Sequence, residues 1–367
     1  MTNFKLLHAA DLHLDSPFEA LSPEAGEARR SAQRRLLFRL AELTEERGAS
    51  ALLLCGDVFD SDKIALETER DFCRALGALP CPVLVTPGNH DPFFPGSVWD
   101  RMKMPPNVHV FKTTEIQCLE LPGIPARFFG AGFQNSFCPP LLRGFSPPKK
   151  QEGLWDIMLL HGDVCPGKSD YNPISPGDIS ACGMDYLALG HIHTREIQKS
   201  AQGVCYAYPG CSEGRGFDEL GEMGALLVGF SETGISTEFI PLGGARYEII
   251  SLDLSDSEPL EAALLATERL SKNDYCRLIL SGECLELPNI QALRSSLEGR
   301  FAELQIRDNT RQKRDIWELA GQDTLSGVFL KKLGNLLENA QTDNERKKLE
   351  LAAAYGIAAI ENGGETL

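Results

Sequence analysis

The residues that could do chemistry stand in short polar motifs that directly follow apolar runs. The motif at residues 87–91, PGNHD, follows the apolar run 83–85, and its glycine allows a sharp turn at the end of a strand. Asn89 offers a carbonyl oxygen to a hard metal ion, and His90 offers an imidazole that gains or loses a proton near neutral pH. Asp91 could hold that imidazole in one tautomer. The motif therefore combines a metal ligand, an acid–base group and an orienting carboxylate.

Four other apolar runs end in the same way, each followed by metal-type ligands. The motifs are Asp11-Leu12-His13 after run 6–10, Gly56-Asp57 after run 51–55, His161-Gly162 after run 156–160, and Gly190-His191-Ile192-His193 after run 186–189. Ligands of open α/β folds collect just beyond the carboxyl ends of the strands. We therefore expect the five strand ends to build one metal site. His8 and His109 lie inside apolar strands and are interpreted as structural histidines.

The elements that must position these motifs alternate between strand and helix. Residues 23–47 predict a long helix, because leucines recur there at helical spacing, and residues 65–79 predict a second one. Together with the first three apolar runs, they predict parallel strands with helices outside. Beyond residue 91, short segments separated by Gly and Pro predict antiparallel pairing in a second sheet. These expected strands are 108–111, 116–121 and 127–132. Residues 204–208, 224–230 and 235–240 predict further, closing strands.

The series Asp-x-His, Gly-Asp, Gly-Asn-His-Asp, His and Gly-His-x-His resembles the calcineurin-like metallophosphoesterase superfamily. Residues 11–17, DLHLDSP, and 208–211, YPGC, further resemble the SbcD-type DNA repair nucleases, especially their Bacillus YhaO-like branch. The motifs extend from residue 4 to about residue 242. The resemblance implies an α/β fold, namely a two-sheet α/β/β/α sandwich with a small α/β second domain and C-terminal helices.

The same resemblance implies a role for each motif residue. Asp57 would bridge two divalent ions, because a carboxylate has two oxygens and a two-metal site clamps both reacting oxygens of a phosphate ester. The other implied ligands are Asp11, His13 and His193 for the first ion, and Asn89, His161 and His191 for the second. His90 would steady the phosphate and protonate the leaving oxygen, and Asp91 would orient His90. Mixed imidazole and carboxylate ligands suit Mn, Fe or Zn; the family makes Mn the first expectation, with Mg as a further option.

The bulk composition describes an acidic chain with ordinary hydrophobicity. It has 367 residues, a formal net charge of −16, and 11 cysteines without a Cys-x-x-Cys pair, which is typical of reduced cytosolic thiols. No apolar run approaches the ~20 residues that span a bilayer, and no secretion signal precedes the first strand. We therefore expect a cytoplasmic protein without a membrane segment. Because nucleic-acid binders are usually basic, the net charge requires local basic patches, metals or a partner to carry any DNA contact.

Two basic clusters are candidates for contact with DNA phosphates. They are Arg29, Arg30, Arg34 and Arg35 on the first long helix, and Lys149 and Lys150 in a proline-rich loop at 138–153. The alternative for the arginines, to which we give more weight, is a solvated helix face balanced by Glu42, Glu45 and Glu46.

The motifs end well before the chain does, and we expect three parts. Residues 1–243 would form the catalytic domain, 244–310 a small α/β capping or recognition domain that begins at Gly243-Gly244, and 311–367 a helical segment. An apolar stripe in the last part has two interpretations, core packing against the body as the default and a docking face for a partner helix as the alternative. Its members are Leu325, Val328, Phe329, Leu333, Leu336 and Leu337.

Three functions are compatible with these observations. The first is a metal-dependent DNA exonuclease or endonuclease in DNA repair, working with an SbcC-type coiled-coil ATPase. The second is a phosphoesterase acting on nucleotides or other small phosphate esters, and the third is a DNA-end-binding scaffold for a partner. The second domain favours the nuclease over a small-substrate enzyme, and intact Asn89 and His90 argue against a pure scaffold. A second copy of the chain is an additional candidate partner.

Overall fold

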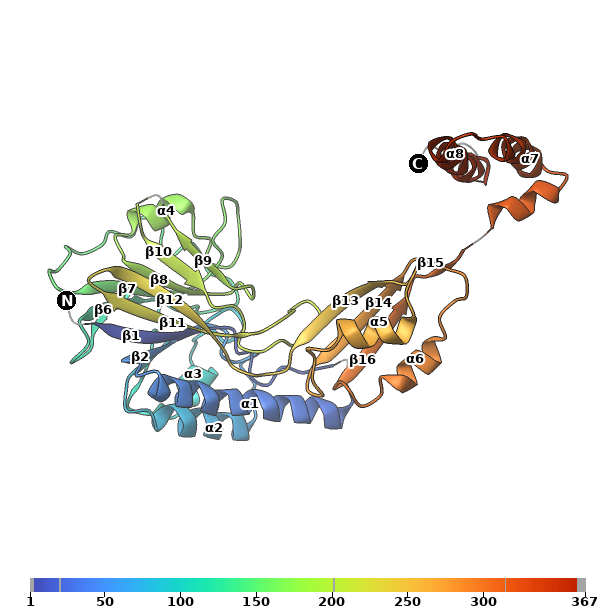
Figure 1. Cartoon of the computed structure of the whole chain (residues 1–367). Helices are drawn as coiled ribbons and strands as arrows, with labels where there is room; N and C mark the ends of the chain where they lie inside the picture. The colour runs from blue at the N-terminus through green and yellow to red at the C-terminus, as the bar shows by residue number, and fades with distance from the viewer. Residues whose placement is uncertain (1–2, 20, 201, 314, 362–367) are drawn as a thin grey trace. The chain divides into compact units, whose positions relative to one another are not determined.

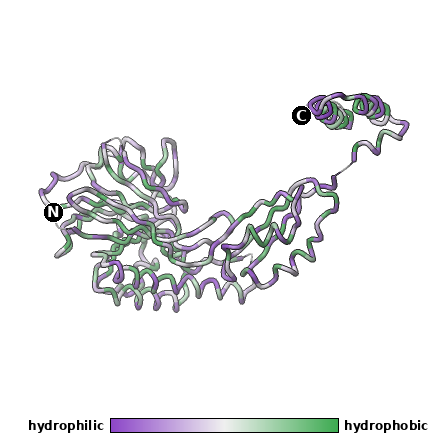
Figure 2. Tube along the Cα trace, viewed as in Figure 1, coloured by the Kyte–Doolittle hydropathy of each residue, from purple (hydrophilic) through white to green (hydrophobic). Residues whose placement is uncertain are grey.

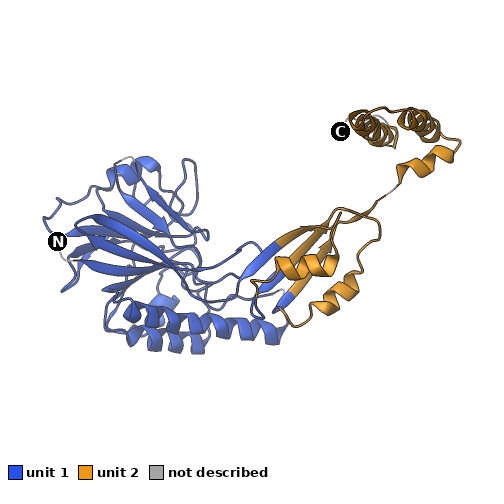
Figure 3. Ribbon diagram, viewed as in Figure 1, with its two compact units in different colours: residues 1–249, 271–276, 301–303 blue, residues 250–270, 277–300, 304–367 orange. Residues whose placement is uncertain are grey.

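The computed structural model describes residues 3–19, 21–200, 202–313 and 315–361. Its contacts divide the chain into two compact units (Figure 3). The first comprises Met1–Ile249, Ser271–Cys276 and Phe301–Glu303, and the second Ile250–Leu270, Arg277–Arg300 and Leu304–Leu367. The three-part division and the boundary after residue 243 stay predictions.

The first unit contains two six-stranded sheets (Figure 1). In the first sheet, β1 (Phe4–Ala9), β2 (Ala51–Cys55), β3 (Val83–Thr86) and β4 (Val108–Val110) run parallel, while β11 (Gly224–Ser231) and β12 (Gly234–Pro241) continue it antiparallel beyond β1. The parallel order of β1, β2 and β3 is the one predicted from the alternating apolar runs. These three strands therefore end at one edge of the sheet.

The second sheet confirms part of the expected antiparallel pairing and corrects the rest. Its centre is parallel and consists of β6 (Ala126–Gly130), β7 (Trp155–His161), β8 (Tyr186–Gly190) and β10 (Cys205–Tyr208). Only the edge strands β5 (Gln117–Glu120) and β9 (Glu196–Lys199) pair antiparallel. The antiparallel pairing expected for segments 116–121 and 127–132 is therefore confirmed by β5 and β6, whereas segment 108–111 pairs parallel with β3 in the first sheet.

Helices cover the outer faces of the two sheets and produce the predicted α/β/β/α sandwich. Apolar side chains of both sheets, such as Leu53 and Ile157, form the core between them. Helices α1 (Pro23–Glu46), α2 (Leu66–Gly77) and α3 (Val98–Arg101) pack on the first sheet, and α4 (Pro176–Ala181) packs on the second. Helix α1 begins at Pro23, a residue that suits the first position of a helix. The Ser22 Oγ caps this end by accepting a hydrogen bond from the Ala25 N–H.

A third, smaller sheet belongs mostly to the second unit. It contains β13 (Tyr247–Asp253), β14 (Tyr275–Ser281) and β16 (Glu303–Asp308), accompanied by helices α5 (Pro259–Ala266) and α6 (Ile290–Ser296). A short pair, β15 (Glu283–Cys284) and β17 (Arg311–Gln312), follows in the same part of the chain.

The last elements pack on one another. They are the 3₁₀ helix η1 (Ile316–Gly321), α7 (Leu325–Glu338) and α8 (Asp343–Glu361), and hydrophobic and hydrophilic residues alternate along them (Figure 2). Leu330, Ala353 and Ile357 form their buried centre, against which Phe329 and Leu333 pack. The predicted apolar stripe is therefore divided, since Leu325, Val328 and Leu336 stay exposed. Within the described residues, no helix is long and apolar enough to cross a membrane.

Candidate metal centre

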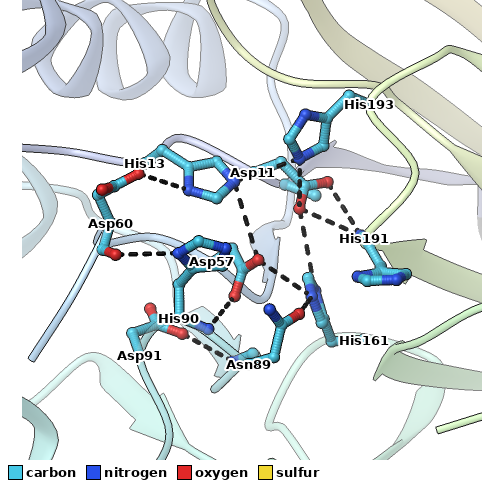
Figure 4. A network of polar contacts seen from close by, with 12 residues as sticks. Asp11, His13, Asp57, Asp60, Asn89, His90, Asp91, His161, His191 and His193 are labelled. Carbon is cyan, nitrogen blue, oxygen red and sulfur yellow. Dashed lines mark hydrogen bonds and ion pairs between the residues drawn. The ribbon is translucent and has the colours of Figure 1, made fainter. Parts of the chain in front are cut away.

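Strand ends from both sheets of the first unit deliver polar side chains to one place (Figure 4). Asp11 and His13 follow β1, Asp57 follows β2, and Asn89 follows β3. From the second sheet, His161 is the last residue of β7, while His191 and His193 follow β8. The structure thus brings together all seven side chains that the resemblance implies as ligands.

The backbone at this place takes conformations that most residues avoid. Asp11, His13, Asp57 and His191 have positive φ angles of 52°, 44°, 48° and 105°. Residues with strained backbone angles cluster at functional sites, and they persist only where the surrounding structure holds them in that conformation. Close packing also requires a glycine beside them, since a Cβ at Gly88 would lie 2.1 Å from Asp57 Oδ1.

One set of ligand atoms comes from Asp11, His13 and His193, which all lie within 4.8 Å of one another. The two imidazole Nε2 atoms are 3.2 Å apart, and His193 Nε2 is 4.0 Å from Asp11 Oδ1. Asp11 also accepts the His191 N–H at 3.0 Å, which fixes its carboxylate.

A second set comes from Asp57, His161 and His191, again within 4.8 Å. His161 Nε2 lies 3.3 Å from Asp57 Oδ2 and 3.0 Å from Asn89 Oδ1, while its Nδ1 donates to the Cys55 carbonyl at 2.9 Å. Asp57 Oδ2 is also 3.8 Å from His13 Nε2 of the first set. Asp57 therefore lies between the two sets, where a bridging carboxylate belongs.

Burial and neighbouring charges shift the pKa values of these groups. Burial raises the pKa of Asp11 to about 6 and lowers the pKa values of His13 and His191 to about 4 each. Burial alone would lower the pKa of His161, but the carboxylates of Asp57 and Asp11 raise it to about 9. Burial would likewise raise the pKa of Asp57, yet His161 and His13 hold it far below its ordinary value. The neutral imidazoles of His13 and His191 beside buried carboxylates are donors that fit divalent transition-metal ions.

The surroundings of His90 correct the role expected for Asp91. His90 is exposed, and its Nδ1 donates to the Asp60 carbonyl at 3.0 Å. The Asp91 carboxylate instead accepts the N–H groups of Gly88, Val58 and Phe59 at 2.7, 2.8 and 3.1 Å. Asp91 therefore holds the loops after β2 and β3 together, and a backbone carbonyl orients His90.

The candidate DNA contacts separate into buried and exposed side chains. Arg29 is buried and donates to Glu213 Oε1 at 2.9 Å and to the Gly214 carbonyl at 2.8 Å. Arg34 is buried too and pairs with Glu27 Oε1 at 3.0 Å. Both are therefore structural residues, which corrects their expected contact with phosphate.

The other four basic candidates remain exposed or partly exposed. Arg30 pairs with Glu27 at 2.9 Å and Lys150 with Asp185 at 2.5 Å, so their charges are partly compensated. Arg35 donates to Ser31 Oγ at 3.3 Å, and Lys149 is exposed. Arg35 and Lys149 are therefore the better candidates for contact with phosphate.

Sequence reasoning missed three residues that surround the ligands. Asp60 accepts from His13 Nδ1 at 3.1 Å, and Glu219 accepts from His193 Nδ1 at 2.7 Å. Arg215 contacts both carboxylates, at 3.1 and 2.7 Å. Asp60 could have been found from its place three residues after Asp57. Arg215 and Glu219 carried no such signal, because they lie in a glycine-rich loop far from the strand-end motifs.

A two-sheet α/β/β/α sandwich with His and Asp ligands at its strand ends defines a metallophosphoesterase. Residues 4–195 match the family model of the calcineurin-like phosphoesterases, and the chain belongs to that family.

Known relatives resemble the chain well beyond those residues. It is 29% identical over 344 residues to the protein named uncharacterized metallophosphoesterase YhaO of Bacillus subtilis, covering 88% of this chain and 82% of that one. It is 24% identical over 313 residues to the DNA double-strand break repair protein Mre11 of Aeropyrum pernix, covering 75% of this chain and 72% of that one.

Among solved structures, a dimetal phosphatase from Danio rerio aligns with 65% of this chain and with 96% of its own chain. The TM-score is 0.44 and the sequence identity is 11%.

Proposed function

We propose that the protein is an SbcD-type nuclease that hydrolyses phosphodiester bonds of DNA. The observation that carries the proposal is the pair of ligand sets with the Asp57 carboxylate between them and the exposed imidazole of His90 beside them. Similarity to a relative named as a DNA double-strand break repair protein supports DNA as the substrate.

We assign each candidate ligand to one of two metal ions. Asp11, His13 and His193 would hold one divalent ion, Asn89, His161 and His191 the other, and Asp57 both. When bound, such a pair supplies Lewis-acid stabilisation of the attacking and leaving oxygens. Manganese is the first expectation for a set of imidazoles and carboxylates, with Fe, Zn or Mg as further options.

His90 is the side chain placed to act on the substrate directly. Its ring lies edge-on to His13 with centroids 4.7 Å apart, and its Nδ1 is occupied by the Asp60 carbonyl. Its Nε2 is therefore the atom left to contact a phosphate, and it would carry the proton for the leaving oxygen when the ring is an imidazolium. Asp91 contributes only indirectly, by fixing the loop that carries Asn89 and His90.

The proposal includes partners and a cellular place. We propose an SbcC-type coiled-coil ATPase as the partner, DNA as the substrate, a cytoplasmic location, and a homodimer as a further assembly. The exposed side chains Leu325, Val328 and Leu336 of α7 are candidates for contact with the ATPase.

One observation favours a different substrate class. The formal net charge is −16, and Arg29 and Arg34 are buried, which leaves few exposed arginines for a DNA backbone. A phosphoesterase acting on nucleotides or other small phosphate esters is therefore the second candidate function.

A nuclease assay separates the two candidates. Linear and circular DNA and a small phosphodiester, bis(p-nitrophenyl) phosphate, are incubated with the full chain, with and without Mn²⁺. We expect cleavage of DNA that requires Mn²⁺ and disappears in Asp57→Asn, since the Asp57 carboxylate lies between the two ligand sets, 3.8 Å from His13 Nε2 and 3.3 Å from His161 Nε2. Hydrolysis of the small ester without cleavage of either DNA, also in the presence of the ATPase, would favour the second candidate.

A further inference from the structure

Two carboxylates outside the ligand sets fix the orientation of two ligand histidines. Asp60 Oδ1 accepts from His13 Nδ1 at 3.1 Å, and Glu219 Oε1 accepts from His193 Nδ1 at 2.7 Å. Each imidazole therefore keeps its proton on Nδ1 and presents the lone pair of Nε2. These two Nε2 atoms meet at 3.2 Å, so the carboxylates turn both rings toward one point.

A single arginine connects these carboxylates. Arg215 Nη1 donates to Asp60 Oδ1 at 3.1 Å, and Nη2 donates to Glu219 Oε1 at 2.7 Å. The Arg215 backbone N–H donates to Glu219 Oε2 at 2.8 Å, so the glutamate is held at both oxygens. Only 21% of the Arg215 side chain and 5% of the Glu219 side chain are exposed, so solvent screens the contacts only partly.

The other ligand set is oriented differently. His161 Nδ1 donates to the backbone carbonyl of Cys55 at 2.9 Å, a neutral partner whose position belongs to β2 itself. The described contacts of Arg215 lead to Asp60, Glu219 and His193 and not to His161 or His191. Replacing Arg215 should therefore change metal binding by the set that contains His13 and His193, and should leave binding by the set that contains His161 and His191 unchanged.

We propose that Arg215 is a positioning residue that aligns His13 and His193 for a shared metal ion, acting through Asp60 and Glu219. The inference rests on the proposed dinuclear phosphoesterase function. A guanidinium suits this task because its planar fork contacts two carboxylates at once, whereas an ammonium is a point charge. It also offsets negative charge that would accumulate where Asp60 and Glu219 lie near the buried carboxylates of Asp11 and Asp57.

The alternative is that Arg215 only holds its own loop in place. Metal binding without substrate distinguishes the two, because a loop clamp has no reason to affect one ion selectively. The experiment titrates Mn²⁺ into the EDTA-stripped full chain, by calorimetry and by electron paramagnetic resonance. The variants are Arg215→Gln, Arg215→Lys and Glu219→Gln, and Arg74→Gln is the control, an arginine of α2 that pairs with Asp71 at the surface.

We expect the wild type to bind two Mn²⁺ and to show the resonance signal of a coupled pair. In Arg215→Gln, one equivalent should bind about 10–100-fold more weakly, the usual effect of losing a group that orients a ligand, while the other stays unchanged. Arg215→Lys should be intermediate, and Arg74→Gln should match the wild type. Adding Glu219→Gln to Arg215→Gln should cost less than the sum of the two single changes, because both act on His193.

Unchanged binding of both equivalents in Arg215→Gln would overturn the inference, as would equal weakening of both. If Arg215→Gln does not fold, Glu219→Gln decides in the same way, since it removes the charge next to His193 but keeps an oxygen acceptor. A wild type that binds fewer than two Mn²⁺ would also overturn it. Two normal Mn²⁺ sites in a chain that cleaves no DNA would contradict the proposed function and leave the inference standing.

Discussion

At the scale of single residues, two neighbours in sequence have separate tasks. His90 is exposed and donates from Nδ1 to the Asp60 carbonyl, while Asp91 is buried and accepts three backbone N–H groups. Asp91 therefore supports the loop, and we propose that His90 faces the substrate. Replacing His90 should therefore affect turnover, whereas replacing Asp91 should affect the structure of the loop.

Replacing His90 by Gln should spare metal binding and depress turnover. The reason is that a general acid contributes typically ~10²–10⁴-fold, whereas Gln cannot give up a proton near neutral pH. Hydrolysis of bis(p-nitrophenyl) phosphate and Mn²⁺ stoichiometry measure the two properties. A variant that loses one Mn²⁺ would make His90 a ligand, since one of its ring nitrogens lies within 4.8 Å of ligand atoms of His13 and Asp57.

His8 should make folding sensitive to acid. Its Nδ1 accepts from the Tyr186 hydroxyl at 2.9 Å and its Nε2 donates to the Leu189 carbonyl at 3.1 Å, which is the structural role predicted for it. Burial lowers the pKa of His8 to about 3, so the unfolded chain takes up a proton that the folded chain refuses. The free energy of unfolding should therefore fall by up to about 1.4 kcal/mol per pH unit as the pH drops from ~6.5 toward 3.

The comparison of wild type with His8→Gln isolates this contribution. Thermal unfolding of the EDTA-treated proteins at pH 7 and pH 5 should show a smaller acid-induced fall in Tm for the variant. Equal falls in Tm would show that His8 does not titrate on unfolding.

At the scale of elements, glycines at the strand ends let the loops approach one another. A Cβ at Gly88 would lie 2.1 Å from Asp57 Oδ1, and one at Gly190 would lie 1.8 Å from the Cys55 carbonyl oxygen. The loops after β2, β3 and β8 therefore meet because these positions carry no side chain. The metal centre depends on this approach.

Replacing Gly88 by Ala should displace Asp57 and weaken both Mn²⁺ sites together. We expect a loss of about 1–3 kcal/mol in the free energy of unfolding, the usual effect of overpacking. The matched control is Gly167→Ala, where an added Cβ meets nothing within 4 Å. Wild-type Mn²⁺ affinity and Tm in Gly88→Ala would show that the loop yields without moving its carboxylate.

At the scale of the whole molecule, the candidate metal ligands and the C-terminal helices occupy separate parts of the chain. Every ligand of the metal centre precedes residue 194, whereas η1, α7 and α8 share a small core of their own around Leu330 and Ile357. Packing of Phe329 and Leu333 into that core removes them from any docking surface and leaves Leu325, Val328 and Leu336 exposed.

A chain of residues 1–315 should therefore keep its metal-dependent hydrolysis of bis(p-nitrophenyl) phosphate and lose association with its ATPase partner. Co-purification with the ATPase and a small-substrate assay measure the two properties. Leu325→Ser with Val328→Ser in the full chain is the finer test, because both side chains are exposed and their loss should leave folding intact. A truncated chain that unfolds or loses hydrolysis would support the alternative in which these helices pack on the body.

The sequence by itself determined the chemistry of the metal centre and the side of the fold on which it lies. Each ligand follows an apolar run, and parallel strands end at one edge of a sheet, so local patterns are sufficient to place Asp11, Asp57 and Asn89 together. The parallel order of β1, β2 and β3 follows from the alternation of strand and helix, whereas the α/β/β/α layers are predicted from the resemblance to a family.

Only the tertiary structure decided which groups surround those ligands. Arg215 and Asp60 are separated by 155 positions, and no local pattern states that their loops meet. The same holds for Asp91, whose hydrogen bonds depend on the approach of β2 and β3, and for Arg29, whose burial depends on Glu213 from a distant segment. A motif specifies what a side chain can do, whereas its partners depend on long-range packing that the motif does not encode.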